Sequence, residues 1–157
     1  MKKNILVFLL LLSYFSVFSQ STNSKWSDLF SYNNVLAFKE KDGKIIAATE
    51  NGVFYYNTIS GEITKLSKAN GLHEVKISAF DYDAATNTAI IGYKSGNLDV
   101  VTADGVTYVV DIPLSQSYTG SKTINNISIN GEKAVISVGY GVSIFNITKK
   151  EFGDTCF

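Results

Sequence analysis

Three glycines at nearly equal intervals divide most of this 157-residue chain into similar units. They are Gly52, Gly96 and Gly141, which lie 44 and 45 residues apart. An apolar run precedes each glycine, and a run that alternates between apolar and polar residues follows it. A repeat of about 40 to 50 residues that is made of short strands is typical of β-propeller blades. The sequence therefore predicts an all-β protein that contains about three blades.

Each repeat is predicted to form four short antiparallel strands. The runs are rich in β-branched and aromatic residues, and turn residues separate them regularly. Asp42-Gly43 and Asn130-Gly131 are typical of hairpin turns, because these residues tolerate a positive φ. The second strand of each repeat is almost entirely apolar, which indicates burial on both faces. The predicted blades cover about residues 34–68, 77–112 and 124–157, with no helix in them.

Three blades do not close a propeller, because known rings use about four to eight. The predicted fold is therefore an incomplete propeller, a fragment of a ring. We expect the chain to be the N-terminal part of a longer protein. Residues 25–32 are a possible ring-closing strand, in which Trp26 is expected to pack against the protein rather than hold a ligand.

The start of the chain has the features of a secretory signal peptide. Lys2 and Lys3 are followed by an apolar stretch and then by modest side chains before Gln20. The apolar stretch is shorter than the roughly 20 residues that a membrane span needs, so a removed signal is favoured over a retained anchor. The predicted domains are a signal peptide at 1–19 and a partial β-propeller at 20–157. The mature protein is thus expected to be exported, without a membrane span.

Charge and cysteine content exclude or disfavour several classes of protein. Without Lys2 and Lys3, twelve lysines face fourteen acidic residues, and the chain has no arginine. Nucleic-acid-binding proteins usually need a basic face and often use arginine, so that class is disfavoured. Cys156 is the only cysteine, so no internal disulfide can form and no cysteine follows the signal for lipid attachment.

The sequence predicts no metal site. Asp81, Asp83 and Asn87 offer oxygen ligands, but Thr86 and Gly92 stand where an EF-hand loop requires glycine and glutamate. An Asx-rich hairpin turn is the favoured interpretation of this segment.

No catalytic residue or cofactor is predicted either. His73 is the only histidine, and neither a second histidine nor a cysteine lies near it in the sequence to complete a metal site. A loop residue that faces solvent is the favoured interpretation. One histidine without a nucleophile motif does not support a Ser-His-Asp site. Carboxylate pairs such as Glu50 with Asp99 stay open at this stage.

The sequence does not identify ligand-binding residues. Lysines near the predicted blade tips are candidates for contact with an anionic glycan, and some tyrosines are candidates for stacking on sugars. A solvated lysine face and tyrosines in the core between blades are favoured instead. The candidates are Lys41, Lys65, Lys68, Lys94, Lys122, Tyr56, Tyr93 and Tyr140.

Several motifs resemble known propeller families. Residues 48–57, followed by Ala69-Asn70-Gly71-Leu72, resemble the propeller repeat of bacterial two-component regulators. An ordered set of segments over essentially all of the mature chain resembles the N-terminal propeller of the PorZ family, a component of the type IX secretion system of Bacteroidota. These segments are 26–34, 91–98, 121–125, 139–145 and 150–155.

The PorZ resemblance implies a cell-surface role at the outer membrane. Members of the family are expected to carry two propellers and a C-terminal sorting domain, and to act without being the catalyst. They are thought to work beside a sortase and an outer-membrane shuttle, presenting anionic lipopolysaccharide that the sortase joins to cargo. Two alternatives stay open: the periplasmic sensor propeller of a hybrid two-component regulator, and a propeller-type glycan hydrolase or lyase.

Overall fold

The structure is a computed structural model that describes residues 29–117 and 119–157. In this part of the chain, twelve strands form three separate four-stranded antiparallel sheets. The first sheet contains β1 (Val35–Lys41), β2 (Lys44–Thr49), β3 (Gly52–Asn57) and β4 (Ile63–Ser67). The second contains β5 (Ile77–Asp83), β6 (Thr88–Tyr93), β7 (Leu98–Thr102) and β8 (Gly105–Val109). The third contains β9 (Ile124–Asn130), β10 (Lys133–Val138), β11 (Gly141–Asn146) and β12 (Glu151–Cys156).

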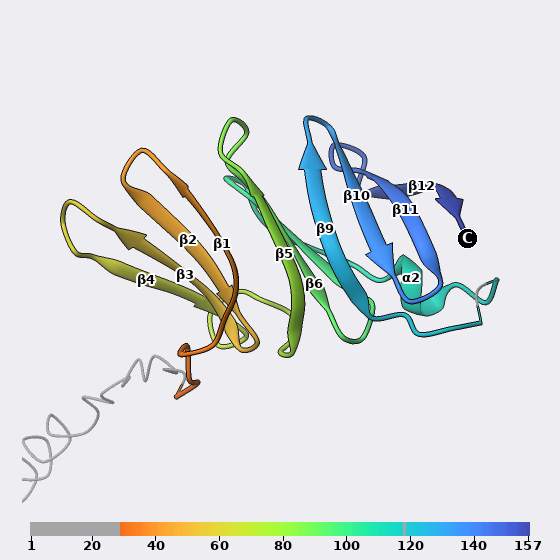
Figure 1. Cartoon of the computed structure of the whole chain (residues 1–157), viewed down its shortest axis with the longest axis horizontal. Coiled ribbons are helices and arrows are strands. Elements are labelled where there is room, and N and C mark those ends of the chain that lie inside the picture. Colours follow the sequence, from red (N-terminus) through yellow and green to blue (C-terminus); the bar gives the residue numbers. More distant parts are fainter. Residues whose placement is uncertain (1–28, 118) are drawn as a thin grey trace, which may run out of the picture.

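The sheets stand side by side as blades, each joined to the next through its first strand (Figure 1). β5 packs against β1 on one side and against β9 on the other. Two apolar cores fill the spaces between consecutive blades. Ile46, Val53 and Ile91 belong to the core between the first two blades, and Ile90 and Ile136 belong to the core between the last two. The predicted all-β, propeller-type fold with three four-stranded blades is confirmed, and these blades do not close a ring.

Burial of the second strands differs among the three blades. β6 is buried at every position, because blades lie against both faces of its sheet. β2 is buried at its last four residues, from Ile46 to Thr49. β10 alternates instead: Ala134 and Ile136 are buried, while Val135 is exposed on the face away from the second blade. The expectation of burial on both faces therefore holds for the middle blade and for most of β2, and is wrong for β10.

Asp81 connects all three blades near their first strands. Its Oδ1 lies 2.9 Å from Nζ of Lys39 in β1, and its Oδ2 accepts a 2.7 Å hydrogen bond from the backbone N–H of Ile129 in β9. The carboxylate is almost fully buried and satisfied by these partners. A residue considered for calcium binding thus positions neighbouring blades.

One element differs from the sequence prediction. The last strand of the second repeat was expected to reach Ile112, but β8 ends at Val109 and α2 (Asp111–Leu114) follows as a single helical turn. Pro113 explains the change, because proline cannot donate to a strand ladder but fits the first turn of a helix. Ile112 is buried from this turn within the core between the second and third blades.

The three repeat glycines do not occupy one equivalent position. Gly52 and Gly141 are the first residues of β3 and β11, whereas Gly96 lies in the turn before β7. Strand register makes Asn97 the counterpart of Gly52, because the β6–β7 turn holds one extra residue. This insertion explains why the two glycine intervals differ by one.

Candidate functional site

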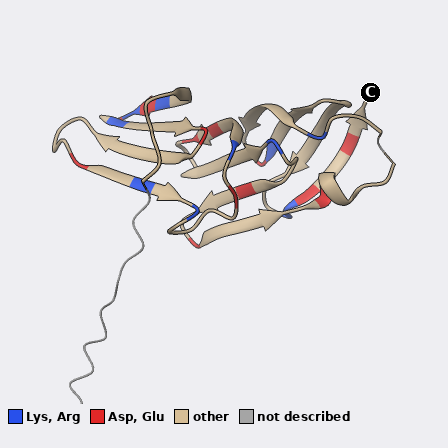
Figure 2. Ribbon diagram, turned by 90° about the horizontal axis from the view of Figure 1, so that it is seen from below, with Lys and Arg blue, Asp and Glu red and all other residues tan. Residues whose placement is uncertain are grey.

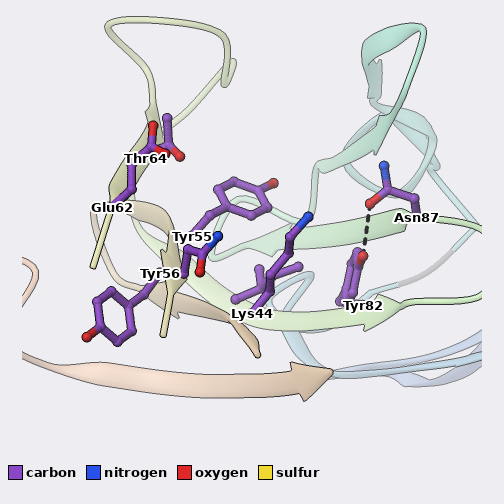
Figure 3. A pocket seen from close by; sticks show the side chains of 9 residues that line it. Lys44, Tyr55, Tyr56, Glu62, Thr64, Tyr82 and Asn87 are labelled. Carbon is purple, nitrogen blue, oxygen red and sulfur yellow. Dashed lines mark hydrogen bonds between the residues drawn. The ribbon is translucent and has the colours of Figure 1, made fainter. Parts of the chain in front are cut away.

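A groove lies between the first and second blades, at the end that carries the β1–β2, β3–β4 and β5–β6 turns. It has a volume of about 340 Å³. Figure 3 shows Tyr55, Lys44 and Tyr82 around the same space, with Tyr55 and Lys44 on the first blade and Tyr82 on the second. The lining residues are Lys44, Ile46, Tyr55, Tyr56, Asn57, Glu62, Thr64, Tyr82 and Asn87. An adjoining hollow shares four of them and adds Lys41, Asp42 and Ala84.

Strand alternation and turn chemistry place these side chains. Tyr55 lies on the face of β3 that packs toward the second blade, within reach of the core there. The turn after β3 is fixed by Asn57, whose Oδ1 accepts hydrogen bonds from the N–H groups of Ile59 and Ser60. Across the groove, the hydroxyl of Tyr82 donates a 2.9 Å hydrogen bond to Oδ1 of Asn87 (Figure 3). Two short turns therefore frame a preformed hollow.

Electrostatics keep the groove close to neutral. Burial raises the pKa of the Tyr55 hydroxyl, and the nearby Tyr82 adds to the rise. Burial also raises the pKa of Tyr82, with a contribution from Asp83. Both phenols therefore stay protonated at neutral pH, while Lys44 and Glu62 contribute opposite charges.

A second polar cluster lies at the other end of the blades, around the loop from β4 to β5. Asp99 is fully buried there. Its carboxylate accepts hydrogen bonds from the backbone N–H of His73 at 2.9 Å and from the Tyr93 hydroxyl at 2.5 Å. Nδ1 of His73 lies 2.7 Å from the same carboxylate, and the imidazole ring stacks on Tyr108 with 4.6 Å between centroids. Because an ionised carboxylate only accepts, Nδ1 carries the hydrogen.

Glu74 extends this cluster toward the surface. Its carboxylate accepts hydrogen bonds from Tyr108, Asn97 and Ser95. Partial burial pushes the pKa of Glu74 upward, but these three hydrogen bonds outweigh it, so the pKa lies below its usual value. Burial and the bond to Glu74 raise the pKa of Tyr108 to about 12. The cluster ties the loop between blades to β7 and β8.

This cluster bears on one expectation and on one question that the sequence left open. His73 lies in an exposed loop as expected, but it does not simply face solvent, because Asp99 and Tyr108 hold its ring. Glu50 and Asp99 do not form a carboxylate pair: Glu50 lies 2.5 Å from Nζ of Lys94, and Asp99 is buried with Tyr93.

The candidate lysines are not gathered on one face. Lys94 pairs with Glu50, and Nζ of Lys122 donates to the carbonyl oxygens of Pro113 and Ser115. Lys65 lies 4.5 Å above the ring of Tyr32. Lys68, at the end of the blades near Glu74, lies apart from Lys41, which lines the hollow beside the groove. Figure 2 accordingly shows blue and red segments interspersed along the ribbon.

The candidate tyrosines have three different environments. Tyr93 is fully buried, and Tyr140 packs beside the core between the second and third blades. Tyr56 borders the groove, but its side chain points away from it (Figure 3) and lines a hollow on the outer face of the first blade. Burial, followed by the bond to Asp99, raises the pKa of Tyr93 far above its ordinary value. The core role favoured from sequence therefore describes Tyr93. Tyr140 packs beside a core and also lines a small hollow near α2 and β12.

The Asx-rich turn is observed as expected. Asp83 accepts hydrogen bonds from the N–H of Ala85 and the hydroxyl of Thr86, and Asn87 has a φ of 52°. Within the described residues, no group of three or more histidine, cysteine or acidic side chains has the arrangement of a metal site. No helix of this same part is long and apolar enough to cross a membrane.

The terminal segments bear on two earlier expectations. The signal-peptide assignment and Trp26 lie outside the described residues. Residues 29–32 are not a strand and lie beside the first blade, where Asn51 donates a side-chain hydrogen bond to the carbonyl oxygen of Ser31. The ring-closing role of 25–32 stays a prediction. Cys156 is exposed at the end of β12.

Sequence reasoning missed the groove and the Glu74 cluster. Tyr55 and Tyr82 come from different blades, and Glu74 meets Tyr108 across 34 positions of sequence. The pattern within each hairpin predicts its turn, but it does not predict how one blade is aligned with the next. To predict that Lys44 and Asn87 line the same groove, consecutive repeats must first be aligned by their first strands.

Comparison with known proteins identifies similar propellers. The family model for the type IX secretion protein PorZ, N-terminal β-propeller domain, matches residues 45–157. The structure of PorZ from Porphyromonas gingivalis, an essential surface component of that system, aligns with 22% identity and a TM-score of 0.73. The alignment covers 83% of this chain and 18% of that one. No curated protein matched.

Two further solved structures show the same architecture. The extracellular domain of a putative hybrid two-component system from B. thetaiotaomicron aligns with 15% identity and a TM-score of 0.62, over 79% of this chain and 17% of that one. Sqt1 of Saccharomyces cerevisiae aligns with 12% identity and a TM-score of 0.56, over 78% of this chain and 34% of that one. Structural similarity at such low identity shows the fold alone.

Proposed function

Since this chain belongs to the family of PorZ N-terminal β-propeller domains of type IX secretion, we propose that it works as a non-catalytic component of that system at the cell surface. In this role the whole protein presents anionic lipopolysaccharide to the sortase that anchors cargo proteins. Its partners are the sortase and the outer-membrane shuttle. The three blades described above supply part of the scaffold.

The family match carries this proposal. It begins in β2 and runs through β12, so it includes both cores between the blades. The chain spans 18% of the solved PorZ chain, and the proposed partners therefore belong to the whole protein. The likeness to the two-component propeller concerns the fold, and no residue described here favours the sensor or the glycan-cleaving alternative.

The arrangement of the lysines supports a scaffold role for these blades, and it does not favour binding of the anionic glycolipid through a group of positive charges. Lys94 and Lys122 are engaged by protein groups, and acidic side chains are interspersed with the remaining lysines. A cluster of free cations would be needed to bind a polyanion strongly. The main feature of these three blades is the apolar packing between neighbouring sheets.

Deleting the gene in its own host tests the proposal. We expect type IX cargo to cross the outer membrane but to appear in the culture medium, unanchored or poorly processed, and the intact gene to restore attachment. The measurement is the fraction of cargo on cells and in medium, determined by immunoblotting. Normal attachment in the deletion strain would reject the proposed role.

A further inference from the structure

The groove between the first two blades has no part in the proposed secretion role, and its lining combines aromatic rings with charged and polar side chains. Tyr55 and Tyr82 present phenol rings, while Lys44, Glu62 and Asn87 place a cation, a carboxylate and an amide around the same volume. Polar and apolar groups thus alternate within a hollow of about 340 Å³. Ligand pockets of about 300 to 1,000 Å³ with a few convergent polar groups are typical of small-molecule sites.

The charges argue against a strongly charged ligand. Lys44 and Glu62 face the groove together, and Lys41 and Asp42 lie side by side in the adjoining hollow. Each cation has an acidic counterpart, so no net field favours an anion or a cation. The half-buried phenols of Tyr55 and Tyr82 add dipoles and no charge.

The inner strands of the first blade take no part in recognition through their backbone. β2 is paired with β1 and β3, and β3 is paired with β2 and β4, so the ladder already uses their backbone groups. β4 and β5, which contribute Thr64 and Tyr82 to the lining, are edge strands of their sheets. The proposal below therefore rests on the side chains that line the groove.

We propose that this groove between the first two blades binds an uncharged sugar residue. A pyranose offers an apolar face of C–H groups and a rim of hydroxyls that both donate and accept. The ring of Tyr55 supplies the apolar platform. Lys44 and Thr64 supply donors, Glu62 supplies acceptors, and Asn87 keeps its Nδ2 donor because its Oδ1 already accepts from Tyr82.

This inference is independent of the secretion role, since it concerns an uncharged sugar and the groove between the first two blades. Lipopolysaccharide presentation concerns an anionic glycolipid and the whole protein. Either can fail without the other, because one is read from cargo attachment and the other from direct binding.

Saturation-transfer difference NMR on the full-length protein tests the inference with a matched pair of ligands. Methyl β-D-glucoside is uncharged, and methyl β-D-glucuronide differs by a carboxylate. We expect transfer to the glucoside that added salt leaves unchanged, and weaker transfer to the glucuronide. Absence of transfer to the glucoside, or transfer only to the glucuronide, overturns the proposal.

Variants then locate the site. Tyr55→Ala should weaken glucoside binding about ten-fold, whereas Tyr55→Phe, which keeps the ring and the packing, should change it little. Lys44→Ala should weaken binding as well. Lys133→Ala is its matched control, because Lys133 begins β10 as Lys44 begins β2 and lies outside the groove. Equal effects of the two lysine variants, or unchanged binding in Tyr55→Ala, overturn the assignment.

Discussion

At the scale of single residues, Asp99 is the fully buried carboxylate of the second blade. Three donors from His73 and Tyr93 converge on a carboxylate with no exposed surface. A buried charge is tolerated only when such partners satisfy it. The residue therefore links the loop before β5 to the interior of the blade.

Replacing Asp99 with asparagine should lower the free energy of unfolding by about 3 kcal/mol, because at least one donor then faces an amide N–H. Urea unfolding followed by circular dichroism measures the change. Asp154→Asn, at an exposed position of β12, should change stability by less than about 0.5 kcal/mol. Similar stabilities for the two variants would show that the Asp99 contacts contribute nothing specific.

Glu74 predicts a pH dependence with a defined sign. Its pKa is lowered in the folded protein, so its stabilising contribution is present above the unfolded value near 4.5 and is lost as pH falls through the folded value. The wild type should be more stable than Glu74→Gln at neutral pH, and the difference should vanish below the folded pKa. Urea unfolding at several pH values tests this. The exposed Glu132→Gln should match the wild type throughout, and a pH-independent gap for Glu74→Gln would contradict the account.

At the scale of strands and turns, close backbone approach explains two of the repeat glycines. A Cβ on Gly52 would lie 2.8 Å from the carbonyl oxygen of Leu66 in β4. A Cβ on Gly141 would lie 2.2 Å from the carbonyl oxygen of Cys156 in β12. Each glycine thus lets the third strand of a blade approach the fourth.

Gly52→Ala should therefore destabilise the first blade by about 2 kcal/mol, because the neighbouring backbone must shift. Gly153→Ala is the control, since its Cβ would have ordinary contact with Ile144 at 3.6 Å. Thermal unfolding compares the two variants. A melting temperature for Gly52→Ala equal to that of Gly153→Ala would contradict the close approach.

Local pattern predicted the strands well and the contacts between them poorly. Short β-branched runs and Asp-Gly turns define hairpins because their signal lies within a few residues. The His73–Asp99 and Asp81–Ile129 contacts span 26 and 48 positions, and no local pattern encodes their register. The helical turn at Pro113 was missed because the apolar run before it reads as a strand.

At the scale of the whole molecule, the two faces of the first blade differ in how much of their apolar surface is buried. The first blade buries Ile46 and Val53 against the second, while its opposite face leaves Leu36 and Phe38 exposed, Phe38 at 63%. That face, together with Phe54 and Tyr56, forms a broad apolar hollow. Exposed apolar surfaces of this type mark contact regions. The propeller fold thus accounts for both the covered and the open faces.

The central claim is that consecutive repeats are adjacent blades, and one cross-link tests it directly. Glu50 and Lys94 lie 44 positions apart, one repeat, and their side chains meet at 2.5 Å between the first two blades. A carbodiimide joins a touching carboxylate and amine as an amide with loss of water. Mass spectrometry of the folded protein should find the Glu50–Lys94 amide, and Glu50→Gln should abolish it. A folded protein in which Lys94 is linked only to other carboxylates would contradict the arrangement.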